Sequence, residues 1–448
     1  MKKKICVIGA GLGGLSVAIR VANKGFEVDL YEQNNTPGGK AGEIKESGYR
    51  FDTGPSLLTM PQVLEDLFSD CNENLEDYLK INRLDIICKY FYPDKSIINA
   101  YSDVEMFGKE IDDKTSDNSE SLNKYLNYCK TIYELAGDLF LTKDPSSVST
   151  YLNSRALNTL LNIRKIDPFR TMNESNESFF KDKRLVQLFN RYATYNGSNP
   201  YLAPATLNII PHVEYNLGSY IPEGGIYAIT KSLRKLAEKK GVNISLNQKV
   251  DEIILENKEV KAIKFNDKII KYDKIISNVD VNFTFKNLIK NFKSRESRRY
   301  EKKLPSFSGL VFYWGIKKEF PELETHNILF SKDYKKEFED LFDNKAIHDD
   351  PTVYIYVSSK LNKNDAPSGK ENWFVMVNAP HIQNQNWDSE VTSARKNVVK
   401  KINNFLKTDI ASLIEFEKIM SPVDIQDRTG SYLGSIYGIS SNDKFAAF

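Results

Sequence analysis

The alternation of apolar and polar positions in the first fifty residues predicts a strand–helix–strand unit. Residues 5–8 form a short apolar run rich in β-branched side chains, which is typical of a strand buried on both faces of a parallel sheet. Apolar residues then recur at helical spacing from Leu15 to Ala22, and Gly25 ends that pattern. Residues 27–32 read as a second strand that ends in an acidic residue. We therefore expect an α/β fold that opens with a Rossmann-type unit.

The rest of the chain predicts further helices and a second sheet. Runs rich in Val, Tyr, Phe and Trp are typical of strands, and we expect them to form a mixed sheet. Helical spacing recurs before and after these runs. The expected strands of this sheet are 306–316, 351–358 and 372–379, a strand hairpin is expected at 84–101, further strands at 242–246 and 249–254, and helices at 122–141, 148–166, 179–192, 227–240 and 393–406.

The turn after the first strand has the composition of a dinucleotide-binding turn. It reads Gly9-Ala10-Gly11-Leu12-Gly13-Gly14. Gly9 permits the tight turn, Gly11 lets the backbone approach a pyrophosphate, and Gly14 lets the helix pack closely on its strand. The phosphates would lie at the helix N-terminus, and Glu32 would accept hydrogen bonds from a ribose hydroxyl. The complete context, rather than the glycines alone, predicts a bound dinucleotide.

Two further motifs favour a larger cofactor than a nicotinamide dinucleotide. One reads Thr36-Pro37-Gly38-Gly39-Lys40, and the other reads Tyr49-Arg50-Phe51-Asp52-Thr53-Gly54-Pro55-Ser56. An extended, enclosed cofactor needs more backbone within contact distance than a nicotinamide cofactor does. These motifs resemble the FAD-binding N-terminus of the amine-oxidase-like flavoproteins, and among them most closely the bacterial carotenoid desaturases of the phytoene-desaturase family. Lys40 stands where many relatives carry Arg, so it keeps the charge but loses the bidentate fork.

The resemblance covers nearly all of the chain and implies FAD as the cofactor. Residues 191–201 resemble a block of this family, especially of the branch that acts on hydroxylated carotenoids. By the same resemblance, backbone near Val250 contacts the adenine, and Asn278 ends a strand at the cofactor. The predicted FAD-binding residues are Gly9, Ala10, Gly11, Gly13, Gly14, Glu32, Gly38, Gly39, Lys40, Gly54, Pro55, Ser56, Val250 and Asn278.

The resemblance also implies a division into domains. The fold would be α/β, with a Rossmann-type FAD-binding domain and a discontinuous, mixed α+β substrate domain of amine-oxidase-like type. The family ordinarily continues past a block like 428–438 into a Gly-rich flavin-binding loop, so we expect this chain either to be truncated or to bind flavin without that clamp. The expected segments are 1–82 and 218–300 in the FAD domain, 83–217 and 301–420 in the substrate domain, and 421–448 as the start of a return to the FAD domain.

The activity that the resemblance implies is carotenoid desaturation, of the 1-hydroxycarotenoid 3,4-desaturase or phytoene desaturase type. A hydride would pass from a long isoprenoid to the flavin, and the electrons would leave to oxygen or a quinone. The sequence offers no acid–base pair at a revealing spacing, so the catalytic side chains stay unassigned. A carotenoid isomerase, a flavin amine oxidase and an inactive nucleotide-binding fragment are the alternatives.

The substrate is almost insoluble, so we expect the enzyme to be cytoplasmic and peripherally bound to a membrane surface. No apolar run reaches the roughly 18 residues that a bilayer span requires. Two interpretations of the helical segment 122–192 stay open. Its apolar residues dock on the membrane, or they face the protein core.

Composition excludes several other classes of function. The 448 residues carry 62 basic and 60 acidic side chains, for a net charge of +2, so no overall field attracts nucleic acid. The four cysteines are scattered without a CxxC pair, which is typical of reduced thiols rather than of disulfides or a metal site. The four histidines lack ligand spacing, and we expect no metal.

Overall fold

A computed structural model describes residues 2–137, 159, 161–290 and 294–442 of the chain. Its first sheet is four-stranded, in the order β13-β1-β2-β9, and all of its pairings are parallel. The strands are β1 Lys4–Ile8, β2 Glu27–Tyr31, β9 Asn243–Ser245 and β13 Lys274–Ser277. The expected Rossmann-type unit is confirmed. Strands β9 and β13, which lie more than 200 residues after β1 and β2 in the sequence, complete its sheet.

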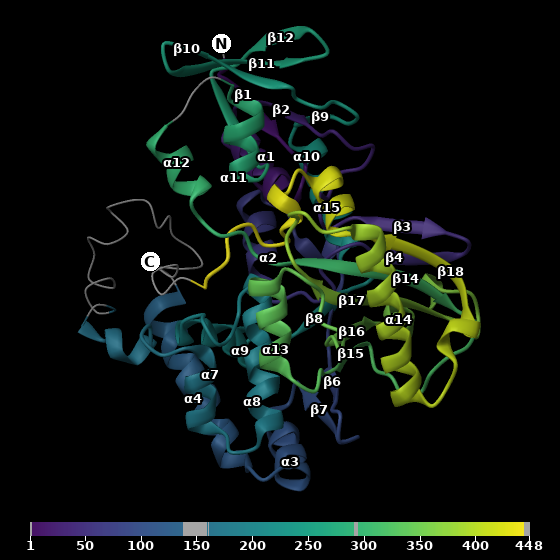
Figure 1. Ribbon diagram of the computed structural model, residues 1–448. Coiled ribbons are helices and arrows are strands. Elements are labelled where there is room, and N and C mark those ends of the chain that lie inside the picture. The colour runs from purple at the N-terminus through teal and green to yellow at the C-terminus, as the bar shows by residue number, and fades with distance from the viewer. Residues whose placement is uncertain (1, 138–158, 160, 291–293, 443–448) are drawn as a thin grey trace.

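Helix α1 (Leu12–Asn23) connects β1 to β2 and packs on the sheet through one face. Its buried residues include Leu15, Ala18 and Ile19, which are the positions that set the helical spacing in the sequence. The chain leaves the helix through Gly25, whose φ of +89° favours glycine. In Figure 1 this sheet lies at the top of the molecule, next to α1 and α10 (Tyr227–Lys239).

The second sheet has seven strands in the order β18-β14-β17-β16-β15-β6-β7. Every pairing is antiparallel except that of β15 with β6, so the expected mixed sheet is confirmed. Strand β14 is buried along its whole length and β17 at every position except Met376, which explains their mainly apolar character. The strands are β6 Ile86–Phe91, β7 Ile97–Tyr101, β14 Ser308–Ile316, β15 His326–Leu329, β16 Val353–Tyr356, β17 Glu371–Ala379 and β18 Ile414–Met420.

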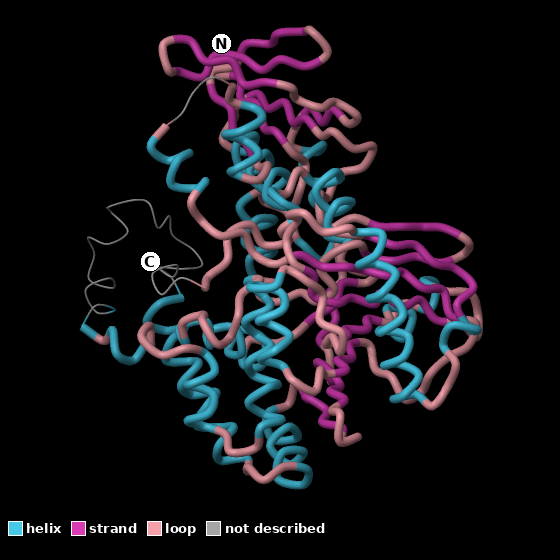
Figure 2. The backbone as a smooth tube through the Cα atoms, in the orientation of Figure 1, coloured by secondary structure: helices cyan, strands magenta, loops and turns pink. Residues whose placement is uncertain are grey.

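Helices gather on one side of the second sheet and form a separate lobe. Figure 2 shows this lobe in cyan at the lower left, while the second sheet lies in magenta at its right. Helix α14 (Trp387–Leu406) packs on the sheet itself through Ala394, Val398 and Ile402. The other helices are α2 Gln62–Asp70, α3 Val104–Lys114, α4 Ser119–Gly137, α7 Met172–Phe179, α8 Lys183–Asn190, α9 Ile209–Pro211, α11 Val281–Phe283, α12 Arg295–Glu301, α13 Tyr334–Glu339 and α15 Pro422–Thr429.

Three small sheets complete the fold. The first is the three-stranded β10-β11-β12, and the other two are the pairs β3-β4 and β5-β8. Their strands are β3 Glu43–Glu46, β4 Tyr49–Asp52, β5 Ile81–Arg83, β8 Tyr220–Pro222, β10 Glu252–Glu256, β11 Glu259–Phe265 and β12 Lys268–Lys271.

The helix predicted at 179–192 is wrong at its start. Phe179 ends α7, and α8 begins only at Lys183 because the Asp182 side chain accepts a hydrogen bond from the Arg184 N–H and caps that helix. The strand predicted at 249–254 begins at Glu252 instead. The helix predicted at 148–166 lies mostly outside the described residues.

In α4 and α8 the apolar residues of the segment 122–192 face mainly the core, whereas Leu161 and Phe169 of the same segment are exposed. Leu122, Tyr125 and Leu126 of α4 are buried, as are Leu188 and Phe189 of α8. The spacing that suggested a membrane-facing stripe is therefore the spacing of core contacts. Among the described helices, none combines the length with the apolar character that crossing a bilayer demands.

Candidate functional site

A cavity of about 460 Å³ lies at the carboxyl ends of β1 and β2, where Rossmann-type folds bind nucleotides. The segments that line it are far apart in the sequence and include residues 248–250, 278–280 and 428–431. Of the predicted cofactor-binding residues, those that line this cavity are Gly9, Gly11, Glu32, Gly38, Gly39, Lys40, Pro55, Val250 and Asn278.

Three of the four glycines in the first turn are required by backbone conformation or by close contacts. Gly9 has a φ of +94°, and a Cβ on Gly14 would lie 1.9 Å from the Gly9 carbonyl oxygen. A Cβ on Gly13 would lie 2.7 Å from Nδ2 of Asn278. Gly13 and Gly14 do not line the cavity, so they hold α1 against the β1 turn and Asn278. Gly11 differs, because it lines the cavity and a Cβ there meets only an ordinary contact of 3.5 Å to Asn278.

Glu32 connects this turn to the second strand. Its carboxylate is buried, at 5% exposure, and accepts hydrogen bonds from the Ala10 N–H at 2.8 Å and from the Asn34 side-chain amide at 2.7 Å. Ala10 therefore contributes through its backbone. A carboxylate has about four acceptor positions, so Glu32 keeps capacity for a sugar hydroxyl from the cavity.

The second glycine pair lies directly opposite the first turn. The Gly38 N–H donates to the Ala10 carbonyl at 2.8 Å, and Gly38 and Gly39 have φ of +123° and +58°. Gly54 packs on the backbone just after this glycine pair, since a Cβ on Gly54 would lie 2.3 Å from the Lys40 carbonyl oxygen. Glycine at these positions therefore lets the backbone segments pack against each other beside the cavity.

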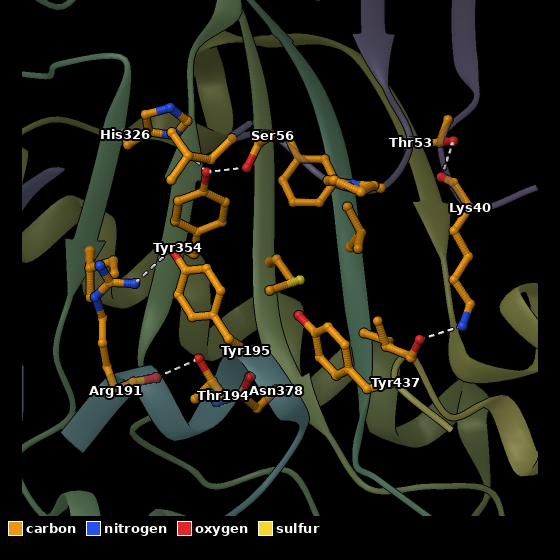
Figure 3. A pocket seen from close by; sticks show the side chains of 18 of the residues that line it. Lys40, Thr53, Ser56, Arg191, Thr194, Tyr195, His326, Tyr354, Asn378 and Tyr437 are labelled. Atoms are coloured by element: carbon orange, nitrogen blue, oxygen red, sulfur yellow. Dashed lines mark hydrogen bonds between the residues drawn. The ribbon is translucent and has the colours of Figure 1, made fainter. Parts of the chain in front are cut away.

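A second cavity, of about 520 Å³, adjoins the first and is lined mainly by apolar side chains. The two cavities share a wall, whose residues are Gly39, Lys40, Pro55, Arg428, Thr429, Ile436 and Tyr437. Gly54 and Ser56 line the second cavity only. Figure 3 shows Lys40 and Tyr437 on one side of this cavity and Arg191 and His326 on the other. A ligand in the second cavity would thus have one end beside the dinucleotide site.

Lys40 lies at the junction of the two cavities. Its Nζ donates to the Ile436 carbonyl, which joins the N-terminal motif to the C-terminal block. Burial lowers the pKa of the Lys40 ammonium, and the nearby Asp280 carboxylate partly offsets this. Lys40 lines the dinucleotide cavity as well, and an ammonium has three donors, so its predicted contact with the cofactor stays a prediction.

Arg428 is the cation that sequence reasoning missed. It lines both cavities, and its guanidinium has neither an ion pair nor a hydrogen-bond acceptor among the described residues. Its backbone carbonyl accepts from the side chains of Gln33 and Asn34, at 3.0 and 3.1 Å. A positive charge without a partner among the described residues, in the wall of a cavity that the first glycine turn and the start of α1 also line, suits a pyrophosphate. The residues present therefore fit a dinucleotide.

The far end of the second cavity is polar. Arg191 and Glu214 form an ion pair of 3.0 Å there, and both line the cavity. Nearby, the Tyr354 hydroxyl bonds to Ser56 Oγ at 2.6 Å and to Nδ1 of His326 at 2.7 Å. Burial, followed by the Arg191 cation, lowers the pKa of His326 to about 3, so its ring is neutral at physiological pH. The block 191–201 drew attention to Arg191, but its partner Glu214 could not be found from spacing.

No group of three or more His, Cys, Asp or Glu side chains that could hold a metal occurs in the part of the chain that the structure describes. The four cysteines are free and buried. Cys88 lines the second cavity, and burial raises its thiol pKa to about 12, so it is protonated and not a nucleophile.

Comparison with known proteins agrees with this geometry. Residues 12–326 match the family described as flavin containing amine oxidoreductase. A 1-hydroxycarotenoid 3,4-desaturase from a Flavobacterium species is 41% identical, over 100% of this chain and 91% of the relative. A 4,4'-diaponeurosporene oxygenase from Staphylococcus haemolyticus is 33% identical, over 99% of this chain and 88% of the relative.

Solved structures show the same fold at low identity. A putrescine oxidase is 12% identical with a TM-score of 0.64, and the match covers 98% of this chain and 89% of the oxidase. An oxidoreductase from Methanosarcina mazei is 16% identical with a TM-score of 0.61, covering 93% of this chain and 86% of that protein. These likenesses support the amine-oxidase-like fold and carry no further argument about substrates.

Proposed function

Because this chain belongs to the flavin-containing amine oxidoreductase family and is an FAD-dependent oxidoreductase, we propose that it is a carotenoid desaturase. The single observation that carries the proposal is an apolar cavity that shares a wall with the dinucleotide cavity. A long isoprenoid requires such a wall, because its carbon–carbon bond must lie beside the flavin ring with water excluded. The relative at 41% identity carries the corresponding name.

The predicted cofactor-binding residues take separate parts in this proposal. The first turn and the N-terminus of α1 would hold the pyrophosphate together with Arg428, and Glu32 would hold the ribose. Residues near Val250 would contact the adenine. FAD supplies the two-electron acceptor that the side chains of the cavity lack. The protein's own task is to orient the polyene and to keep the cavity dry.

A small amine is a poorer fit for the second cavity than a polyene. A buried protonated amine needs an uncompensated anion, whereas the Glu214 carboxylate is already bound by Arg191 and by the Tyr192 and Tyr195 hydroxyls. Most of the remaining lining is apolar. This argument favours a carotenoid over an amine substrate.

The proposal is tested by expressing the chain in a host that accumulates carotenoids and analysing the pigments. A desaturase lengthens the conjugated system, so absorption shifts to the red and each step removes two hydrogens from the mass. A Gly14→Ala variant, whose Cβ collides with Gly9, is the inactive control. Oxygen added to the end groups would favour an oxygenase, and a change of isomer without a change of mass would favour an isomerase. Unchanged pigment in cells that contain the FAD-loaded protein contradicts the proposal.

We further propose that the enzyme takes its substrate from a membrane surface through a patch that we call the 161–170 patch. Leu161 and Phe169 are 77% and 71% exposed there, and Arg164 and Lys165 between them are exposed cations. Exposed apolar side chains with basic neighbours suit the interface of an anionic bilayer. Phe169→Ser should weaken sedimentation with phosphatidylglycerol vesicles, whereas Ile269→Ser, which changes an exposed apolar residue on β12, should not. If the Phe169→Ser and Ile269→Ser variants sediment equally with the vesicles, the proposal that the 161–170 patch binds the membrane is refuted.

The electron acceptor is proposed to be oxygen or a quinone. Anaerobic turnover with a short-chain quinone, compared with turnover in air, separates the two.

A further inference from the structure

The polar end of the second cavity contains an ion pair that a hydrocarbon substrate would not need. Arg191 is 8% exposed and Glu214 is 0% exposed, yet both lie in the wall of a mainly apolar cavity. Removing two charges from water costs several kcal/mol per ion, and their attraction often does no more than offset this cost. Replacing a buried ion pair by apolar residues of similar size is often neutral or stabilising. The pair therefore calls for an explanation beyond stability.

The surrounding side chains hold the pair in one position. Glu214 accepts hydrogen bonds from the Tyr192 and Tyr195 hydroxyls as well as from Arg191. The Arg191 guanidinium lies over the rings of Tyr90, Tyr192 and Tyr195, at 4.3 to 5.5 Å from their centroids. A cation fixed in this way has lost its rotamer freedom before a ligand arrives, so binding costs less entropy.

Arg191 keeps hydrogen-bonding capacity after these contacts. A guanidinium has five N–H donors. Three side-chain acceptors are within reach among the described residues, namely Tyr90 at 2.7 Å, Glu214 at 3.0 Å and Tyr195 at 3.5 Å, and the last of these is a weak contact. A second buried atom at this end, Nε2 of His326, has no hydrogen-bond partner in the described structure. Buried polar groups without partners are rare in native proteins and point to a missing partner.

We infer that Arg191, held in place by Glu214, binds an oxygen atom on the end group of the polyene substrate. The inference rests on the proposed function and makes it narrower. A hydroxylated carotenoid is already implied by the name of the relative at 41% identity, and the new element is Arg191 as the residue that selects for the end-group oxygen. Hydrocarbon ends are discriminated against because they leave the guanidinium donors unpaired. Arg191 and the shared wall with Lys40 lie on different sides of the cavity, so anchoring the oxygen also sets which carbon–carbon bond reaches the flavin site.

The test is a competition between two polyenes of equal length in liposomes, one with a terminal hydroxyl and one without. Purified FAD-loaded enzyme converts the mixture, and the ratio of the two kcat/KM values is measured. Wild type should prefer the hydroxylated polyene. The double variant Arg191→Met with Glu214→Gln removes both charges, so no carboxylate is left buried and unpaired. In this variant the ratio of the two kcat/KM values should fall at least about tenfold, which is the effect of losing one hydrogen bond to a charged group.

A matched control separates specificity from general damage. Lys401 is also buried and paired, with Asp350 at 2.8 Å, but it does not line the cavity. Lys401→Met should lower stability and leave the ratio unchanged. If the double variant fails to retain FAD, Arg191→Lys replaces it, since this variant keeps the charge, loses the planar fork, and should still lower the ratio.

The outcomes distinguish this inference from the proposed function. Wild-type enzyme that converts neither polyene contradicts the proposed function itself. Wild-type enzyme that converts both equally, or variants that fold and keep the wild-type ratio, overturn the role of Arg191 and leave the desaturase assignment standing.

Discussion

The substitution Gly11→Ala tests the cofactor site with little disturbance of the protein. A Cβ on Gly11 would lie 3.5 Å from Oδ1 of Asn278, which is an ordinary van der Waals contact. The residue is the N-cap of α1 with φ of −66°, a value that alanine adopts freely. Alanine is a poorer N-cap than glycine, so the expected loss of stability is at most about 1 kcal/mol.

The expected effect on FAD is larger, because Gly11 lines the cavity in which we propose that the pyrophosphate lies, and a methyl group would take up space there. Inserting a methyl into a close-packed contact costs about 1–3 kcal/mol. We therefore expect the Kd for FAD to rise roughly 5- to 150-fold. The measurement is titration of the apoprotein with FAD, followed by quenching of flavin fluorescence, with urea unfolding of the apoprotein in parallel.

Two further glycine variants serve as comparisons. Gly14→Ala places its Cβ 1.9 Å from the Gly9 carbonyl oxygen, so both stability and FAD affinity should fall. Gly25→Ala meets no atom within 4 Å but has φ of +89°, so it should lose about 1–2 kcal/mol of stability and keep its FAD affinity. A Kd for Gly11→Ala within twofold of wild type would show that no phosphate approaches Gly11 and would refute the proposed placement.

Three other predictions concern charged and titratable groups. Arg428→Met should raise the Kd for FAD by at least about tenfold without changing apoprotein stability, because the guanidinium has no ion pair or hydrogen bond to lose among the described residues. Arg50→Met should cost about 3–5 kcal/mol in urea unfolding, since it leaves the buried Asp52 carboxylate without its 2.6 Å ion pair. Folding lowers the pKa of His326 from 6.5 to about 3, so the unfolded chain binds its proton first as the pH falls. Stability should therefore decrease below pH 6.5 by up to about 1.4 kcal/mol per pH unit from this residue, and His326→Gln should flatten that slope in unfolding curves recorded between pH 4 and 7.

The sequence predicts the parts of this fold that depend on local patterns. The unit from β1 to β2 follows from a buried apolar run, a helical repeat and a glycine stop, and each of these signals lies within a few residues of the element it defines. The start of α8 was misplaced because the Asp182 cap, and not the apolar spacing, decides where that helix begins. An amphipathic repeat is the same whether its apolar face meets the core or a membrane, so only the structure assigns the buried residues of α4 to the core.

The candidate site was predictable where glycine carries the signal and not where a distant partner does. Gly9 and Gly38 need positive φ, and such positions leave a trace in the sequence itself. By contrast, Arg428 and Glu32 come into one cavity from positions nearly 400 residues apart, and no spacing rule connects them. The ion pair between Arg191 and Glu214 also leaves no recognisable pattern in the sequence, since both residue types are common on protein surfaces.

The two cavities are coupled through the wall they share. The segment 33–40 holds the backbone of the C-terminal block 428–438 in place. Gln33 and Asn34 donate to the Arg428 carbonyl, and Lys40 donates to the Ile436 carbonyl. The same block lines the second cavity through Thr429 and other residues. A cofactor that contacts Arg428 and the first glycine turn would therefore fix the wall against which the polyene lies, because both surfaces belong to one hydrogen-bonded segment. On this geometry, binding of FAD and correct placement of the substrate both depend on the block 428–438.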